Sequence, residues 1–427
     1  MPTTTTDTTA SDLSTDHSRA VADGAHSHGP AEVPNASRAD RPTSFALTDF
    51  PLPTGREEEW RFSPVNRLQG LFAGVLTGTA PELEIDADEA VAVERVGHDD
   101  PRLGAVGAPS DRIAAAAWES FGEALVLTVP ANHVSTKETT VRVRGTAGAG
   151  AAAQHIVIIA EQMSESVVIL DHVGVAELAQ TVEIIVRDGA HLRVVSVQDW
   201  DAGAVHASSH RSLLGRDATL KHVVITLGGD VVRLTPEAAF TGPGAEVEMN
   251  GLFFTDAGQH QEHRLFVDHA VEKCISRVTY KGALQGEGAH SVWVGDVLIR
   301  KEAEGTDTYE LNRNLVLTDG ARADSVPNLE IETGEIKGAG HASATGRFDD
   351  EQLFYLRSRG IPEAAARRLV VRGFFAEMIA KIGVPSVQER LIAAIDEELN
   401  IVMGELIGVD EIDERELIHA IESDVPE

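Results

Sequence analysis

Sulfur and aromatic side chains are scarce in this sequence. The chain has a single cysteine, Cys274, and only 5% of its 427 residues are aromatic. One thiol cannot form an internal disulfide, and it cannot build a metal site from cysteines alone. A core with so few rings must be filled by Val, Ile, Leu and Ala, which are typical of flat, closely stacked strands.

Positive charge is also scarce. Lys and Arg number 36 against 68 Asp and Glu, which gives a net charge of −32. Such a surface repels phosphate backbones, so the composition argues against direct nucleic-acid binding. We favour solubility as the reason for the charge, although composition alone does not separate it from an electric field that attracts metal cations.

Several motifs of enzymes and membrane proteins are missing. The sequence contains no GxxxxGK[ST] loop, GxSxG elbow or HExxH motif, so we expect no ATP hydrolysis by this chain itself. It also has neither a basic leader followed by an apolar run nor an uncharged stretch of transmembrane length. We therefore expect a cytoplasmic protein without membrane contact.

The N-terminal part divides into a tail and a docking segment. Residues 1–42 contain hardly any large apolar side chain, so we predict a disordered tail. Three histidines of this tail could catch metals, but a solvated tail is the favoured interpretation: His17, His26 and His28. Residues 43–84 form a predicted docking segment with some helix, in which the run REEEWR (56–61) is a solvated helical turn with Trp60 as its aromatic anchor.

The largest region, 85–345, reads as strands. Short Val- and Ile-rich runs recur, several with period two, such as TVEIIV from Thr181. Many begin just after a Gly–Ala turn: Gly189–Ala190, Gly215 to Ala218, Gly244–Ala245, Gly288–Ala289 and Gly320–Ala321. The alanines lie 28, 27, 44 and 32 residues apart, a loose period that indicates stacked coils. Because recurrent Asn-Gly hairpin turns are missing, a β-helix or similar solenoid fits better than a sandwich.

Residues 346–427 switch to helical patterns and form a predicted helical domain. Asp349 and Asp350 offer an N-cap for the first helix, and Gly360 ends it. Three further helices are predicted at 362–382, from about 386 to 406, and at 414–421. A helical domain is therefore expected to follow the solenoid.

Few residues of this sequence suggest a ligand site. His260 and His263, with His269 nearby, form the best local histidine cluster, but histidines three apart on a strand face opposite sides. A structural or solvent-facing role is therefore favoured for them. Cys274, in a predicted strand, is best explained as a small buried apolar residue. His341 lies among small residues at the junction of strands and helices, where spacing alone favours a structural role.

The stretch from Asn312 to Phe375 strongly resembles the SufB/SufD family of iron–sulfur cluster assembly proteins. The pieces that carry the resemblance are Tyr280-Lys281-Gly282, Gly305-Thr306-Asp307, Pro327-Asn328-Leu329-Glu330-Ile331, His341-Ala342-Ser343-Ala344-Thr345-Gly346 and Gln352 to Ile361. The resemblance covers roughly residues 150–400. The run FPLPTGREEEWRFSPV and the chain length make this sequence most similar to the SufD branch.

The resemblance implies both a fold and partners. It implies a right-handed parallel β-helix with helical parts at both ends, paired with a SufB-like β-helix subunit. It also implies that a SufC-like ABC ATPase docks on the C-terminal helical domain, so this chain is expected to be a non-catalytic scaffold. The region singled out for docking contains Phe354, Tyr355, Arg359, Phe374 and Phe375. Whether the isolated chain forms a homodimer stays open.

His341 gains a functional role through the resemblance. The histidine at this position in the family is thought to help ligate the nascent cluster, opposite a cysteine of SufB. Many SufD proteins have Cys-Ser-His here, whereas this chain has Ala339, Gly340 and His341, so any role of that cysteine is lost. Because clusters normally take about four thiolates, a chain with one cysteine holds none alone. We expect His341 to ligate iron or a transient cluster at the partner interface, with no cofactor bound stably by the isolated chain.

Two other interpretations stay open. A SufB-type subunit would need reactive cysteines, of which Cys274 is the only candidate, and Leu356 stands where SufB often has Cys. A β-helix enzyme acting on polysaccharides would need paired carboxylates in a groove, and no clear motif of that kind is present. The cluster type, the iron donor and the electron source cannot be read from the sequence.

Overall fold

The computed structural model describes residues 38–348 and 350–403. The chain divides into two compact units, Met1–Arg41 and Pro42–Glu427. Of the first unit only residues 38–41 are described, with the 3-10 helix η2 (Arg38–Asp40). Most of the predicted tail with its three histidines, and the helix predicted at 414–421, lie outside the described residues.

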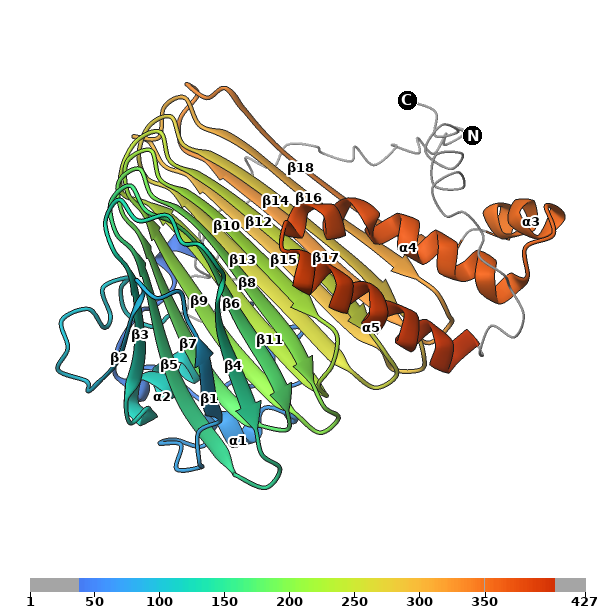
Figure 1. The fold of residues 1–427 in the computed structure, drawn as a ribbon, viewed down its shortest axis with the longest axis horizontal. Helices are drawn as coiled ribbons and strands as arrows, with labels where there is room; N and C mark the ends of the chain where they lie inside the picture. Colours follow the sequence, from blue (N-terminus) through green and yellow to red (C-terminus); the bar gives the residue numbers. More distant parts are fainter. Residues whose placement is uncertain (1–37, 349, 404–427) are drawn as a thin grey trace, which may run out of the picture. The chain divides into compact units, whose positions relative to one another are not determined.

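Two nine-stranded sheets make up most of the second unit (Figure 1). The first sheet runs in the order β1 (Glu82–Asp86), β4 (Thr139–Gly145), β6 (Glu165–Gly174), β8 (His191–Trp200), β10 (Thr219–Thr226), β12 (Glu246–Thr255), β14 (Ile275–Leu284), β16 (Asp307–Val316) and β18 (Gly338–Arg347). The second runs in the order β2 (Ala92–Val96), β3 (Ala124–Val129), β5 (Ala151–Ala160), β7 (Glu177–Val186), β9 (Val205–Leu214), β11 (Val231–Phe240), β13 (His260–His269), β15 (His290–Ile299) and β17 (Arg322–Ile331).

The chain alternates between the two sheets and so winds into a β-solenoid. Apart from the antiparallel pairs β1–β4 and β2–β3, neighbours within a sheet are next-but-one strands in the sequence and pair in parallel. Parallel neighbours need a crossover connection, and here the crossover is the strand of the other sheet. The predicted mainly-β solenoid with helices towards both termini is confirmed.

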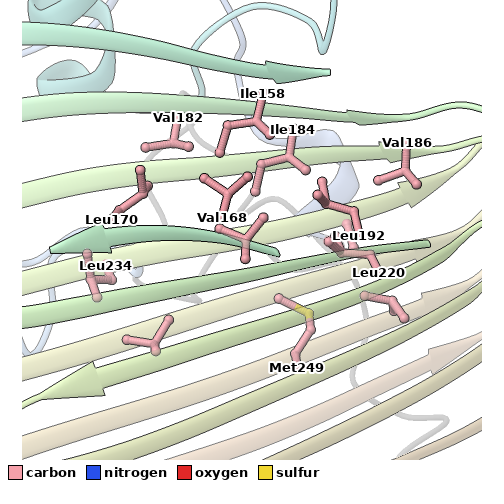
Figure 2. Packing of buried hydrophobic residues seen from close by; sticks show 14 of the residues in the cluster. Ile158, Val168, Leu170, Val182, Ile184, Val186, Leu192, Leu220, Leu234 and Met249 are labelled. Carbon is pink, nitrogen blue, oxygen red and sulfur yellow. The ribbon is translucent and has the colours of Figure 1, made fainter. Parts of the chain in front are cut away.

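Apolar side chains fill the space between the two sheets (Figure 2). Parallel register stacks equivalent residues from coil to coil, so that Leu192, Leu220 and Val247 form one continuous ladder. All three are buried, and burial of each such side chain contributes about 1.5–3 kcal/mol. The predicted aliphatic core is therefore built by stacking similar apolar side chains from coil to coil.

The Gly–Ala turns form corners of the coils. Gly189 and Gly244 have φ values of +64° and +77°, a left-handed conformation that glycine adopts without steric cost. The residues that follow them, Ala190 and Ala245, are fully buried inside the corner. The glycine thus turns the chain, and the small alanine lets the corner close over the core.

The corner positions also explain the irregular spacing of the alanines. The paired strand starts place four small residues at equivalent corners of successive coils: Ala190, Ala218, Ala245 and Cys274. Ala289, which gave the gap of 44 residues, precedes β15 and belongs to a corner of the other sheet. The coil length is therefore regular, and the single cysteine occupies a position that alanine fills elsewhere.

One part of the region read as strands is a helix. α2 (Arg112–Ser120) lies between β2 and β3, and the side chain of Asp111 accepts a hydrogen bond from the backbone N–H of Ala114 at 2.8 Å. This is an N-cap, and the four alanines at 114–117 favour helix. The run lacks the two-residue alternation that marks an amphipathic strand, and the alanines are buried against β5 and β7.

The predicted docking segment covers the outer face of the second sheet. It contains the 3-10 helix η3 (Leu47–Asp49) and the short helix α1 (Gln69–Phe72). Trp60 is buried and packs edge-on against Phe72 at 5.0 Å between ring centroids. The aromatic anchor is thus in place, although residues 56–61 form turns instead of a helix.

Three helices follow β18: α3 (Asp350–Ser358), α4 (Glu363–Ile382) and α5 (Pro385–Met403). α4 and α5 cover the outer face of the first sheet, and their cluster includes Val195, Val223, Phe254, Phe375, Leu391 and Ile395. Gly383 ends α4 with φ +64°, and Pro385 begins α5. α3 packs on α4 through Leu353, Leu356 and Ala366.

Candidate functional site

The last coil of the solenoid is open. β17 and β18 are the terminal strands of their sheets, and among the described residues each pairs with a strand on one side only. Both are ten residues long, and neither contains a fully buried residue. Their outer backbone N–H and C=O groups are therefore available to another strand.

The opposite end of the solenoid is finished differently. β1 and β2 are only five residues long and pair antiparallel with their neighbours. Exposed charges line both strands: Glu82, Glu84, Asp86, Glu94 and Arg95. Short, charged edge strands resist pairing with another chain, so the two ends of the solenoid differ in their capacity to bind strands.

His341 lies on β18 and faces the interior of the open coil. Parallel pairing aligns it with Glu310 of β16. In β16 the side chains of Glu310 and Asn312 are buried, whereas Tyr309, the residue before Glu310, is exposed. Because aligned residues of neighbouring strands point to the same face, His341 shares the inward side with Glu310. It is exposed because no described coil covers it.

Polar side chains replace the aliphatic core near the open end. Ser325 of β17 donates a hydrogen bond from Oγ to Asn312 Oδ1 at 2.7 Å. Asn314 Nδ2 donates to Ser325 Oγ at 3.0 Å and to Thr345 Oγ1 at 3.1 Å. This network links the two sheets across the interior and gives the end of the coil a polar lining that also contains Ser343.

Glu310 is the unusual member of this lining. Its side chain is 1% exposed, and neither carboxylate oxygen has a hydrogen-bond partner among the described residues. Burial, together with the nearby charge of Asp296, raises the pKa of Glu310 to about 8. Glu310 was not predicted as a site residue, because a single Glu in a strand that alternates polar and apolar residues looks solvent-facing.

A family model described as "SUF system FeS cluster assembly, SufBD core domain" matches residues 143–374. The chain belongs to the SufBD family. A SufBD family protein of Mycobacterium tuberculosis is 54% identical over 365 residues, which cover 84% of this chain and 92% of that protein. The iron–sulfur cluster assembly protein SufD of Escherichia coli is 29% identical over 214 residues, half of each chain. Another SufBD family protein, from Mycobacterium leprae, is 30% identical over 47% of this chain but only 23% of its own length.

Membership of the SufBD family places the protein in iron–sulfur cluster assembly by the SUF system. This argues against an enzyme that acts on polysaccharides, and the similarity to a SufD favours the SufD branch. Among the helices that the structure describes, none has the length and apolar character needed to cross a membrane.

In this SufBD protein Cys274 is a buried corner residue. Its Sγ lies 3.5 Å from the carbonyl oxygens of Gly242 and Glu272. Burial raises the pKa of the thiol, which disfavours the reactive thiolate. The interpretation as a small buried residue is therefore confirmed, although Cys274 lies just before β14 and not in the predicted strand.

The three histidines of β13 do not converge. His263 points into the solenoid and shares a 3.0 Å hydrogen bond with Thr226, whereas His260 points to the outer face, 3.2 Å from Glu262. His269 is buried on the inner side. The predicted opposite orientation of His260 and His263 is confirmed, and within residues 38–348 and 350–403 no group of three or more His, Cys, Asp or Glu is arranged to hold a metal.

The residues singled out for docking differ in exposure. Phe354 and Tyr355 on α3 are 75% and 49% exposed, and the Arg359 guanidinium lies 5.1 Å from the Tyr355 ring. Phe374 is partly buried beside Lys281, and Phe375 is fully buried against the first sheet. α3 therefore presents an aromatic, basic surface, while Phe375 fixes α4 to the sheet beneath.

Sequence analysis also missed a buried charge network under the docking segment. Arg233 of β11 is 2% exposed, stacks over the Trp60 ring at 4.2 Å, and pairs with Glu59, Asp111 and Glu262. Glu59 is thus not part of a solvated turn, as the run REEEWR had suggested. Its carboxylate pairs with the guanidinium of Arg233. The strand pattern did not predict this pair.

Proposed function

We propose that this chain is a SufD-type, non-catalytic scaffold that pairs with a SufB-like β-helix through its open last coil. It works in the cytoplasm, and it docks a SufC-like ABC ATPase on its C-terminal helices. The observation that carries the proposal is the pair of unpaired edges at β17 and β18, set beside the short and charged strands at the other end. A second solenoid can continue both ladders at once and cover the polar lining.

His341 is the candidate ligand at this interface. It sits on the exposed terminal strand, faces inward, and would lie between the two solenoids after pairing. Because its one cysteine is buried at the corner before β14, two strands from β18, this chain supplies no thiolate there. Iron or a nascent cluster, as cargo, would therefore be held by His341 together with ligands of the partner. Such a mixed site binds more loosely than four thiolates and suits release of the cluster.

The surface of α3 supports the docking part of the proposal. Phe354, Tyr355 and Arg359 offer exposed aromatic and cationic groups of the kinds enriched at protein interfaces. α4, on which α3 packs, is joined to the first sheet by a continuous apolar cluster. Dimerisation of two ATPases would pull on these helices. The apolar side chains that join α4 to the first sheet would pass the force to the strands that carry the interface.

Replacement of Ser343 by Arg tests the pairing. Ser343 is exposed at the open end and faces inward, so the isolated variant should fold normally. Stacking of a partner coil would bury an unpaired charge, and the dissociation constant of the complex should rise about a hundredfold, or about 2.7 kcal/mol. The measurement is a titration of one purified subunit with the other. Thr77→Arg, at a residue exposed near the other end of the solenoid, is the matched control. Equal affinity of both variants and the wild type would count against the interface.

Replacement of His341 by Ala tests the ligand role. The complex should still assemble, because the side chain contributes no backbone pairing, but iron and sulfide in anaerobic preparations should fall at least tenfold. His191→Ala, at another exposed histidine, is the control and should retain the wild-type content. Normal iron and sulfide in the His341→Ala complex would remove the histidine from the site.

A further inference from the structure

Glu310 is a buried carboxylate for which the described residues offer no partner. An unpaired charge in a protein interior costs several kcal/mol, and even a neutral carboxyl group loses its hydrogen bonds with water when it is buried. Buried polar groups normally have partners, and an exception is explained by strain, by a functional role, or by a bound ion or water. Only the last coil, β17 and β18, lies between Glu310 and the open end.

The opposite wall is shaped to admit this carboxylate. Gly295 lies in the middle of β15. Glycine weakens the interior of a strand, and its presence there often marks a site that another group approaches closely. A Cβ at this position would lie 2.7 Å from Glu310 Oε1 and 2.5 Å from the Trp293 ring. The glycine therefore leaves the space that the acid and the indole share, and the Trp293 Nε1–H also has no hydrogen-bond partner within residues 38–348 and 350–403.

We propose that Glu310 and His341 together hold a single ferrous ion in the open coil, a site that rests on the proposed scaffold function. The two residues are aligned on neighbouring strands and share the inward face. Their backbones are about 4.8 Å apart, so one carboxylate oxygen and one imidazole nitrogen can both reach an ion at about 2.0–2.2 Å.

The donor set fits a divalent first-row metal. Carboxylate and imidazole are the ligands of non-haem Fe²⁺ sites, which keep open positions for water or for further ligands. Here those positions would face the open end, where a partner could add its own ligands. The net charge of −32 favours the approach of a cation. Glu310 would thus receive iron before any thiolate of the partner does.

The test is anaerobic titration of the full-length chain with Fe²⁺ alone, followed by calorimetry and by thermal unfolding. The wild type should bind one Fe²⁺, and its Tm should rise with Fe²⁺ concentration. Glu310→Gln should bind at least tenfold more weakly and lose the Tm shift. Without metal, its Tm should equal or exceed that of the wild type, because the change removes an unpartnered acid. Glu335→Gln, an exposed carboxylate in the turn before β18, is the matched control and should behave as the wild type.

Two results would overturn the site. One is wild-type-like Fe²⁺ affinity in Glu310→Gln, and the other is no saturable Fe²⁺ binding by the wild type. Titration with the partner subunit separates this inference from the proposed function. Loss of Fe²⁺ binding by Glu310→Gln with intact pairing supports the iron site. Intact pairing without any iron binding refutes the site alone, and failure of the wild type to pair refutes the scaffold function.

Discussion

Lowering the pH from 7 to 5 should reduce the free energy of unfolding by at least about 3 kcal/mol. The cause is a group of buried histidines inside the solenoid. Burial lowers the pKa of His222 to about 4 and those of His263 and His269 to about 3. Burial also holds the pKa values of His206 and His210 well below their usual range.

The sign follows from which state binds protons. In the unfolded chain histidine titrates near ~6.5, so below that pH the unfolded state takes up protons that the folded state cannot. His222, His263 and His269 therefore each cost about 2 kcal/mol between pH 7 and pH 5, and His206 and His210 act in the same direction. Glu310 acts in the opposite direction, because its raised pKa keeps it protonated in the folded state, and it offsets about 2–3 kcal/mol. The balance remains a large loss on acidification.

Urea unfolding at pH 7, 6 and 5 measures this effect. His222→Gln should reduce the loss between pH 7 and pH 5 by about 2 kcal/mol, because it removes one group whose pKa is lowered by burial alone. A free energy of unfolding that stays constant from pH 7 to pH 5 would show that these imidazoles can be protonated in the folded protein.

Replacing Arg233 by Met should lower the free energy of unfolding by about 3–5 kcal/mol. Removal of one partner leaves buried carboxylates uncompensated. Burial on its own would raise the pKa of Glu262, but the hydrogen bond from His260 and the guanidinium groups of Arg233 and Arg264 lower it to about 2. The variant also loses the stacking on Trp60, which anchors the docking segment.

The comparison for Arg233 is Arg61→Met, measured by urea unfolding at pH 7. Arg61 forms an ion pair with Glu58 and lies over the Phe62 ring, and the side chains of Arg61 and Glu58 are 49% and 71% exposed. Its replacement should change the free energy of unfolding by no more than about 0.5 kcal/mol. Similar losses in the two variants would mean that the buried network contributes no more than a surface pair. Limited proteolysis should, in addition, cut the docking segment faster in Arg233→Met.

The solenoid itself could be predicted from the sequence because its coil repeats. Val- and Ile-rich runs and Gly–Ala corners carry the signal, and φ of +64° at Gly189 with a buried Ala190 gives its physical cause. The period looked irregular for two reasons. Corners of both sheets were counted as one series, and the corner at Cys274 was left out because it has no alanine. Helix α2 was missed because its alanines pack on the outer face of a sheet, where a run of small residues has no strand alternation.

The candidate site was only partly predictable. His341 was found through resemblance, whereas its spacing alone favoured a structural role. Glu310 and Arg233 were not found, because their importance depends on burial, and burial of a charged residue is decided by which strand or segment lies across from it. Gly295 shows the same limit: its role is visible only when Trp293 and the carboxylate of another coil are seen to share its space.

The two ends of the described solenoid differ: short, charged strands lie at one end, and the unpaired edges of β17 and β18 lie at the other. This difference bears on the size of an assembly. A solenoid with unpaired strand edges at both ends would polymerise into a fibre, as stacked β-structure readily does. In the proposed pairing, this chain offers unpaired strand edges at one end of the described solenoid only, so a single partner would occupy them. Growth would stop at a particle of two solenoids, with the enclosed site at its centre.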